Sequence, residues 1–323
     1  MLMILMFAAA CGTDASSAPD PDDIGSGPTD EELAIQIGEG LAAACPLGAP
    51  NDEAARLDCG DKLARLDVLR DNMAEPFLWG GQGVGKPLDL YENSLTRFNP
   101  LVWRKMYASL FMFGHDFRVE TNGSQTLLHM PYAFRGALDA GSYPYPFWHS
   151  KGKWDSYQLA TEVVLVLENG RLLGAMRGAV QDPARPYIAH TFDGKWSWTT
   201  PEGIPQPSAM LYSNLFSPSN TMIPVLDQAF RQLEAKARVQ NCAGCHSPDN
   251  SQKVSQLVLL NYPNQAIYAR NEIVAELEAN TMPVTIGIQN TADRQELLTL
   301  ARTFQSAAEQ ALRLEGERPA QVQ

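Results

Sequence analysis

The sequence predicts two folded parts, an α+β domain over residues 30–218 followed by an all-α domain over residues 219–316. Residues 161–180 hold two apolar β-type runs around Asn169-Gly170, a pair that supplies the positive φ angles of a tight hairpin turn. Residues 225–237 and 297–311 instead repeat apolar side chains every three or four positions, as amphipathic helices do. A chain of 323 residues, 45% of them hydrophobic, is long enough for two cores.

The first 29 residues are expected to lie outside these folded parts. Residues 1–10 are an apolar run that ends in small residues before Cys11, and this pattern resembles a bacterial lipoprotein signal peptide followed by an acylated cysteine. The alternative is a buried N-terminal helix, because ten residues are too few to span a bilayer. Residues 11–29 are rich in Ser, Pro, Asp and Gly and predict a disordered tether.

The charge distribution excludes some classes of partner. The net charge is −12, and ten of the acids lie in residues 1–55, which contain no Lys or Arg. Nothing here resembles a basic nucleic-acid surface. Residues 80–86 read G-x-x-x-x-G-K, but Pro87 stands where a nucleotide-binding loop needs a hydroxyl, so we expect a flexible loop and no nucleotide.

The α+β part should open with two helices. The acids Asp30, Glu31 and Glu32 suit a helix N-terminus, and a second helix is expected over residues 52–72. Cys45 and Cys59 suit a disulfide between these helices in an oxidising compartment, and the alternative is two free buried thiols.

The rest of this part should form a sheet. We expect a helix over residues 100–113, a strand over residues 126–130, and hairpins over residues 161–180 and 191–198. An aromatic cluster between them is expected to pack in the core or in loops, with a ligand site as the alternative; it comprises Tyr143, Tyr145, Phe147, Trp148 and Trp154. The upstream histidines stand singly and are expected to be structural, with iron ligation or catalysis as reserve roles; they are His115, His129, His149 and His190.

The all-α part contains the pentapeptide Cys242-Ala243-Gly244-Cys245-His246. C-x-x-C-H is the attachment signature of a c-type haem, in which two thiols bind the porphyrin and the adjacent imidazole binds the iron. A zinc site would need four ligands, and no second Cys/His pair is near in the sequence. A redox dithiol would follow a strand, whereas an amphipathic helix over residues 224–237 precedes this motif.

Two further helices are expected downstream, over residues 265–279 and from Asn290 or Thr291 onward, with Met282-Pro283 between them. This order resembles the class I c-type cytochrome domain, over about residues 221–316. The resemblance implies thioether bonds at Cys242 and Cys245, His246 as proximal ligand and Met282 as distal ligand.

Counting residues also favours Met282, because it is the only methionine after His246, which is the last histidine. Alternative axial ligands are Met222, an upstream histidine or Lys253. We expect the second imidazole nitrogen of His246 to meet a backbone carbonyl near Pro248 or Pro263.

Together these features predict an exported lipoprotein, periplasmic or on the cell surface, with one covalent haem c that passes single electrons to a redox partner protein. Gly12, where some bacteria place an acidic retention residue, favours the outer membrane. One alternative is a peroxidase-type or oxidase-type haem enzyme with His149 or His129 as acid or base. The other is a haem-bearing module in which residues 31–215 recognise a partner. Residues 317–323 are expected to be a tail.

Overall fold

A computed structural model describes residues 27–80, 96–135, 160–178, 212, 215–246, 259–260, 263–284 and 286–317. The expected signal peptide and tether up to residue 26, the loop at residues 81–87 and the hairpin at residues 191–198 lie outside these ranges. So do Cys11, His149, His190, Lys253 and the aromatic cluster of residues 143–154.

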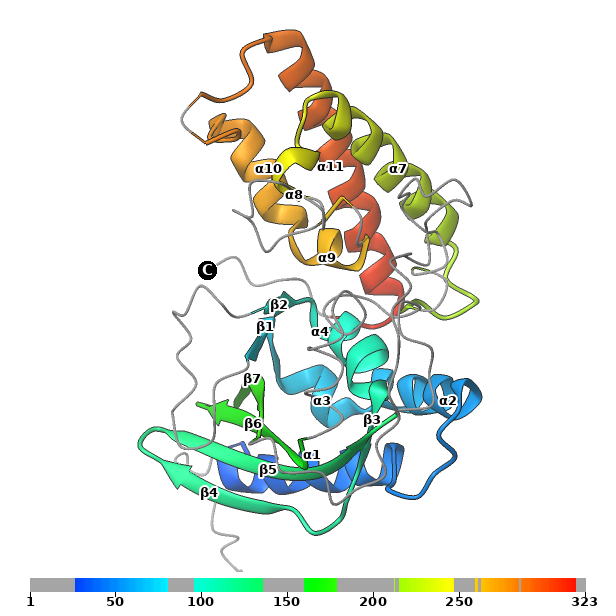
Figure 1. The fold of residues 1–323 in the computed structure, drawn as a ribbon, viewed down its shortest axis with the longest axis vertical. Helices are drawn as coiled ribbons and strands as arrows, with labels where there is room; N and C mark the ends of the chain where they lie inside the picture. The colour runs from blue at the N-terminus through cyan, green and yellow to red at the C-terminus, as the bar shows by residue number, and fades with distance from the viewer. Residues whose placement is uncertain are drawn as a thin grey trace, which may run out of the picture.

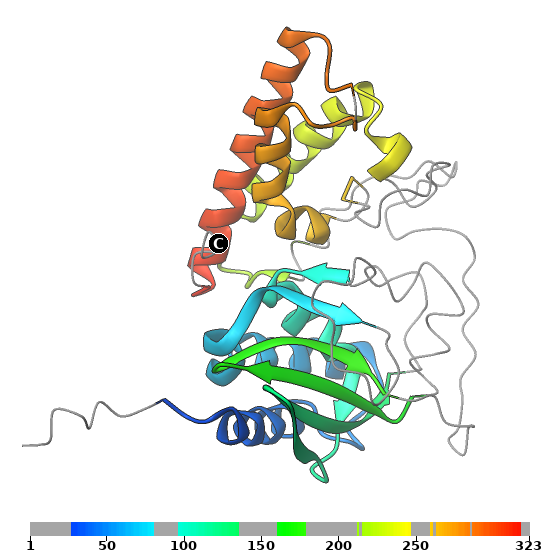
Figure 2. The same cartoon turned by 90° about the vertical axis from the view of Figure 1, so that its left-hand side faces the viewer.

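Two layers are stacked along the long axis of the molecule, a curled sheet with its helices and a layer of helices above it (Figures 1 and 2). The lower layer contains α1 (Asp30–Ala44), α2 (Glu53–Ala64), α3 (Asp67–Asn72), β1 (Met73–Gly80), β2 (Thr96–Phe98), α4 (Pro100–Val102), a π-helical turn η1 (Trp103–Tyr107), a 3-10 turn η2 (Ala108–Leu110), β3 (Phe111–Phe113), β4 (Arg118–Asn122), β5 (Gln125–Phe134), β6 (Glu162–Glu168) and β7 (Arg171–Arg177). The upper layer contains α7 (Ile223–Val239), α8 (Ala243–His246), α9 (Pro263–Tyr268), α10 (Arg270–Ala279) and α11 (Thr291–Leu314).

The seven strands form one sheet in the order β2-β1-β7-β6-β5-β3, and β4 pairs with β5 outside this path. Among the described strands only β1 and β7 pair in parallel, and the other pairs are antiparallel. The hairpin of β6 and β7 is confirmed, and Asn169 and Gly170 have φ angles of 54° and 73°. These positive angles give the twist that a two-residue hairpin turn needs.

The first predicted helix is confirmed, and its start is explained by Thr29. The Thr29 side chain accepts a hydrogen bond from the Glu32 backbone while the Glu32 carboxylate accepts one from the Thr29 backbone, which is a capping box. The second predicted helix is divided at Leu66 into α2 and α3. The helix predicted over residues 100–113 ends at Leu110, because Phe111–Phe113 pairs with β5 as a strand.

The upper layer follows the predicted helix order, but its helices do not form a separate unit. In the described ranges, buried residues of both layers belong to one continuous hydrophobic cluster that extends from Leu33 through Leu128 and Leu165 to Phe230 and Phe304. The expected fold class, with an all-α class I cytochrome c-like domain behind an α+β domain, is therefore wrong. The described residues form one mixed α/β structure, because the helices bury their apolar faces in a core that the sheet layer also shares.

Buried charges cross the boundary between the two layers. Arg270 of α10 is 1% exposed, and its guanidinium binds Glu75 of β1 at 2.8 Å and also Glu309 of α11. Glu75 in turn accepts a hydrogen bond from Asn99 at 2.9 Å. Arg104 of η1, also buried, pairs with Glu317, the first residue of the expected tail. Burial raises the pKa of the Glu317 carboxyl, and the charge of Arg104 opposes that shift.

We expect Arg270→Met to destabilise the protein by about 3 kcal/mol, because it leaves two largely buried carboxylates without their cation. The matched control is Arg302→Met, since Arg302 is 54% exposed and its partner Glu278 is 47% exposed. That change should cost no more than about 0.5 kcal/mol.

Urea unfolding followed by tryptophan fluorescence and by far-ultraviolet circular dichroism checks this prediction. Trp79 and Trp103, the tryptophans among the described residues, are buried in the sheet layer and their fluorescence reports on it, whereas Arg270 is in the helical layer. A shared core predicts that both signals shift together in Arg270→Met. An unshifted tryptophan transition would mean that the two layers unfold independently.

Candidate functional site

The Cys242–His246 pentapeptide forms a single helical turn, α8, just after α7. Asn241, with a φ angle of 61°, reverses the chain at the end of α7, and the Cys242 backbone N–H then donates to the Ala237 carbonyl at 3.0 Å. The N–H groups of Cys245 and His246 both donate to the Cys242 carbonyl, at 3.1 and 2.9 Å. Residues three apart on such a turn lie on the same side, so the two cysteines share a face.

The two cysteines carry free thiols, and both are half-buried. Cys242 packs against the hydrophobic core, and burial raises the pKa of its thiol. The residues between the cysteines are Ala243 and Gly244, and a Cβ added at Gly244 would meet nothing closer than 3.7 Å. The turn therefore presents two reduced sulfurs without a bulky side chain between them. This donor set, with an imidazole next to it, fits covalent attachment of one haem.

A salt bridge fixes the end of α7 that leads into this turn. The Lys236 ammonium binds Asp293 at 2.7 Å and Glu296 at 2.6 Å, both in the first two turns of α11. At the opposite end, the Asn220 side chain donates to the Ala311 carbonyl at 3.0 Å. Contacts at both ends hold α7 antiparallel to α11, so the end of α7 that leads into α8 lies beside the first two turns of α11 (Figure 1).

Met282 lies in the loop between α10 and α11 and is half-buried. The loop begins where Asn280 ends α10 in a left-handed conformation, with a φ of 55°. Two apolar side chains of the same loop are largely exposed, Val284 at 68% and Ile286 at 63%. Met282 thus comes from a different element than the pentapeptide, and the two elements are linked through the packing of α10 and α7 against α11.

Among the described residues, the structure separates three rival ligands from the pentapeptide. Met222 precedes the first residue of α7, which is 17 residues long and therefore spans about 25 Å. His129 lies in β5 of the sheet layer, whereas α8 belongs to the helical layer (Figures 1 and 2). Its Nδ1 accepts a hydrogen bond from Arg118 at 2.7 Å, because a guanidinium can only donate. His115 is exposed beside β4.

Of the two carbonyls suggested as partners for the His246 ring, the one near Pro248 lies outside the described residues. The Pro263 carbonyl accepts a hydrogen bond from the Tyr212 hydroxyl at 3.3 Å. The His246 carbonyl accepts the backbone N–H of Leu260 at 3.3 Å, which fixes the C-terminal end of α8.

Two kinds of feature are absent from the described residues. No three side chains among their His, Cys, Asp and Glu residues lie close enough together to hold a metal ion. None of the helices within the described ranges has the length and apolar character needed to cross a membrane.

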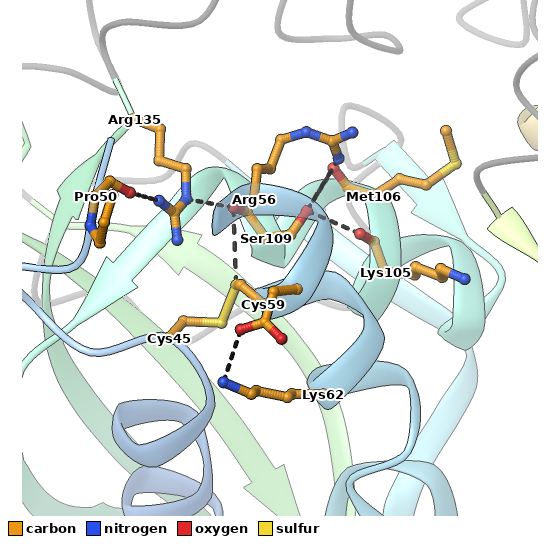
Figure 3. Close-up of a disulfide and its surroundings, with 10 residues drawn as sticks. Cys45, Pro50, Arg56, Cys59, Lys62, Lys105, Met106, Ser109 and Arg135 are labelled. Atoms are coloured by element: carbon orange, nitrogen blue, oxygen red, sulfur yellow. Dashed lines mark hydrogen bonds and ion pairs between the residues drawn. A yellow bond between two sulfur atoms is a disulfide. The ribbon is translucent and has the colours of Figure 1, made fainter. Parts of the chain in front are cut away.

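Cys45 and Cys59 form a disulfide, with an Sγ–Sγ distance of 2.02 Å, between the end of α1 and the middle of α2 (Figure 3). Beside it the Ser109 carbonyl accepts a hydrogen bond from the Arg135 Nε at 2.9 Å, and the Cys59 sulfur lies 3.8 Å from the same oxygen. The bridge therefore joins the two helices at the point where they meet the turn before β3.

The structural roles of two polar residues in the helical layer, Lys236 and Asn280, were not predicted from the sequence. The apolar periodicity of α7 places Lys236 on its polar face, and only the packing of α7 on α11 shows that it binds two acids. Asn280 follows the last residue of α10. An Asn at such a position is a recognisable signal for a left-handed helix end.

We expect iodoacetamide to alkylate Cys242 in the folded, haem-free protein about tenfold more slowly at pH 7.5 than in the urea-unfolded protein. A raised pKa leaves less thiolate at this pH, and the thiolate is the reactive form. The rate in the folded protein should keep rising above pH 9. Peptide mass spectrometry after timed quenching measures the rate at Cys242 alone. Equal rates in the folded and unfolded protein would contradict the effect of burial.

With this geometry in hand, the chain was compared with known proteins: no family model, curated protein or solved structure matches it.

Proposed function

We propose that this protein carries one covalently attached haem c and transfers single electrons. The observation that carries the proposal is the pair of half-buried free thiols on one helical turn with a histidine directly after the second. In the proposed site Cys242 and Cys245 would hold the porphyrin, and His246 and Met282 would bind the iron.

The protein's own residues have separate tasks in this proposal. Cys242 and Cys245 would hold the porphyrin by thioether bonds, and addition of a thiol S–H to a vinyl group needs no oxidant. The hydrogen bonds of α8 hold the two sulfurs and the imidazole on one rigid turn. The Met282 thioether is a neutral, soft donor and raises the reduction potential relative to a second imidazole. A haem held in this way supplies one-electron exchange between ferric and ferrous iron.

The same proposal includes export and a lipid anchor at Cys11, with the outer membrane favoured. The disulfide between Cys45 and Cys59 supports an oxidising compartment, where such bonds persist. The partner would then be another redox protein that meets this one at the membrane surface, and the sheet layer would serve as its scaffold or docking surface.

The enzyme alternative has less support. Of its two acid–base candidates, His129 lies in β5 and is bound to Arg118, and His149 lies outside the described residues. The described aromatic side chains, such as Trp79, Trp103 and Phe111, pack against one another in the core. The third alternative, a partner-binding module that carries haem, shares the attachment chemistry and differs only in the role of the sheet layer.

Expression in a host that attaches haem tests the proposal. The peptide bearing Cys242 and Cys245 should gain the mass of one haem, and the double variant Cys242→Ser/Cys245→Ser should gain none. Gly244→Ala is the matched control: it keeps the motif and adds a Cβ that the turn accommodates, so attachment should persist. An unmodified peptide from the wild-type protein would refute the function proposed here.

Spectroscopy of the haem-loaded protein separates the carrier from the enzyme. A carrier should show the methionine-to-iron charge-transfer band when oxidised and should not bind carbon monoxide when reduced. Met282→Ala should abolish the band and permit carbon monoxide binding, because it opens one axial position. Met222→Ala, which changes an equally half-buried methionine about 25 Å away along α7, should alter neither property. Rapid reaction of the wild-type protein with carbon monoxide and peroxide would instead favour the enzyme.

A further inference from the structure

The loop that carries Met282 is closed at its base by one side chain. Asn280 Oδ1 accepts the backbone N–H of Ile288 at 2.8 Å, and Asn280 Nδ2 donates to the Ile288 carbonyl at 3.5 Å. The amide of Asn280 therefore pairs with both backbone groups of one residue, much as a strand partner would. We call the segment between them, residues 281–284 with 286 and 287, the Met282 loop.

Gly287 brings the returning chain close enough for this pairing. Its φ is 61°, and a Cβ placed there would lie 2.5 Å from Asn280 Nδ2 and 2.6 Å from the Asn280 carbonyl oxygen. Any other residue at position 287 would push the two sides of the loop apart. Gly287 is therefore a second residue, besides Asn280, on which the closure of the loop depends.

Further hydrogen bonds fix the two flanks of Met282. Before it, the Thr281 N–H donates to the Glu276 carbonyl at 3.1 Å, which holds Thr281 on the last turn of α10. After it, the Pro283 carbonyl accepts the N–H groups of Ile286 and Gly287, at 3.2 and 2.9 Å. Met282 thus lies between two anchored residues in a loop whose ends Asn280 joins.

We propose that Asn280 is a positioning residue, which holds the Met282 loop closed so that the thioether stays available as an axial ligand. This inference rests on the proposed function. A thioether carries no charge to draw it to iron, so its binding depends on how little freedom the loop must lose when the bond forms. A loop that is already closed has lost this conformational entropy during folding. Formation of the iron–sulfur bond then carries no further cost for ordering the loop.

Asn280→Gly tests the inference. Glycine keeps the left-handed backbone at position 280 and removes only the two side-chain hydrogen bonds to Ile288. Asn280→Asp should rescue part of the effect, because it retains the acceptor for the Ile288 N–H. Gly287→Ala should disrupt the same pairing, because its Cβ would clash with Asn280. The matched control is Asn290→Gly, which removes another helix-end Asn whose Oδ1 accepts two backbone N–H groups, at 2.9 and 3.2 Å.

In the haem-free protein, hydrogen exchange at the Ile288 amide should become about tenfold faster in Asn280→Gly and in Gly287→Ala, and should stay unchanged in Asn290→Gly. In the haem-loaded protein, Asn280→Gly and Gly287→Ala should lose the charge-transfer band at a lower temperature than wild type. Their reduced forms should bind carbon monoxide at least tenfold faster. Asn280→Asp should fall between Asn280→Gly and wild type in both measurements.

The outcomes separate a failure of this inference from a failure of the proposed function. A wild-type protein without attached haem refutes the proposed function, and the inference that rests on it falls with it. A wild-type protein with haem but without the charge-transfer band leaves attachment intact and refutes the role of Asn280. The inference is also overturned if Asn280→Gly matches Asn290→Gly, keeping the charge-transfer band and excluding carbon monoxide equally well. In that case the attachment site still stands.

Discussion

The contact between Arg270, Glu75 and Glu309 is the constraint on which the two-layer arrangement depends. A guanidinium that is 1% exposed cannot lose its partners without a large cost, and here its partners come from β1 and α11. The surrounding apolar residues form one cluster that continues through both layers. The helical layer is therefore anchored to the sheet layer by burial and by charge together, and its orientation is set by residues far away in the sequence.

This arrangement explains why a small helical layer can hold a precise site. The pentapeptide is a single turn, too short to be stable by its own hydrogen bonds. It is held because α7 leads into it, α11 fixes α7 through Lys236 and Asn220, and α11 itself rests on the core. The Met282 loop has its own local closure by Asn280. The proposed ligands thus come from a turn held by tertiary packing and a loop held by a side chain.

Sequence periodicity was a good guide to individual elements. It placed α1, the hairpin of β6 and β7, α7 and α11 near their observed bounds, because these segments have strong caps, turns or apolar faces of their own. It was less successful over residues 100–113, where Phe111–Phe113 joins β5 as a strand. The apolar run Phe111–Phe113 suits a helix or a strand equally well, and the partner strand decides between them.

Local sequence is enough to identify the spacing of Cys242, Cys245 and His246, the lone downstream Met282, and the signals that begin and end the helices. Long-range packing is needed to show that the helices and the sheet share one core, that Met222 and His129 lie away from the pentapeptide, and that Asn280 closes the Met282 loop. The physical reason is that spacing and periodicity act over a few residues. Burial, ion pairing and loop closure join residues up to about 200 positions apart, such as Glu75 and Arg270.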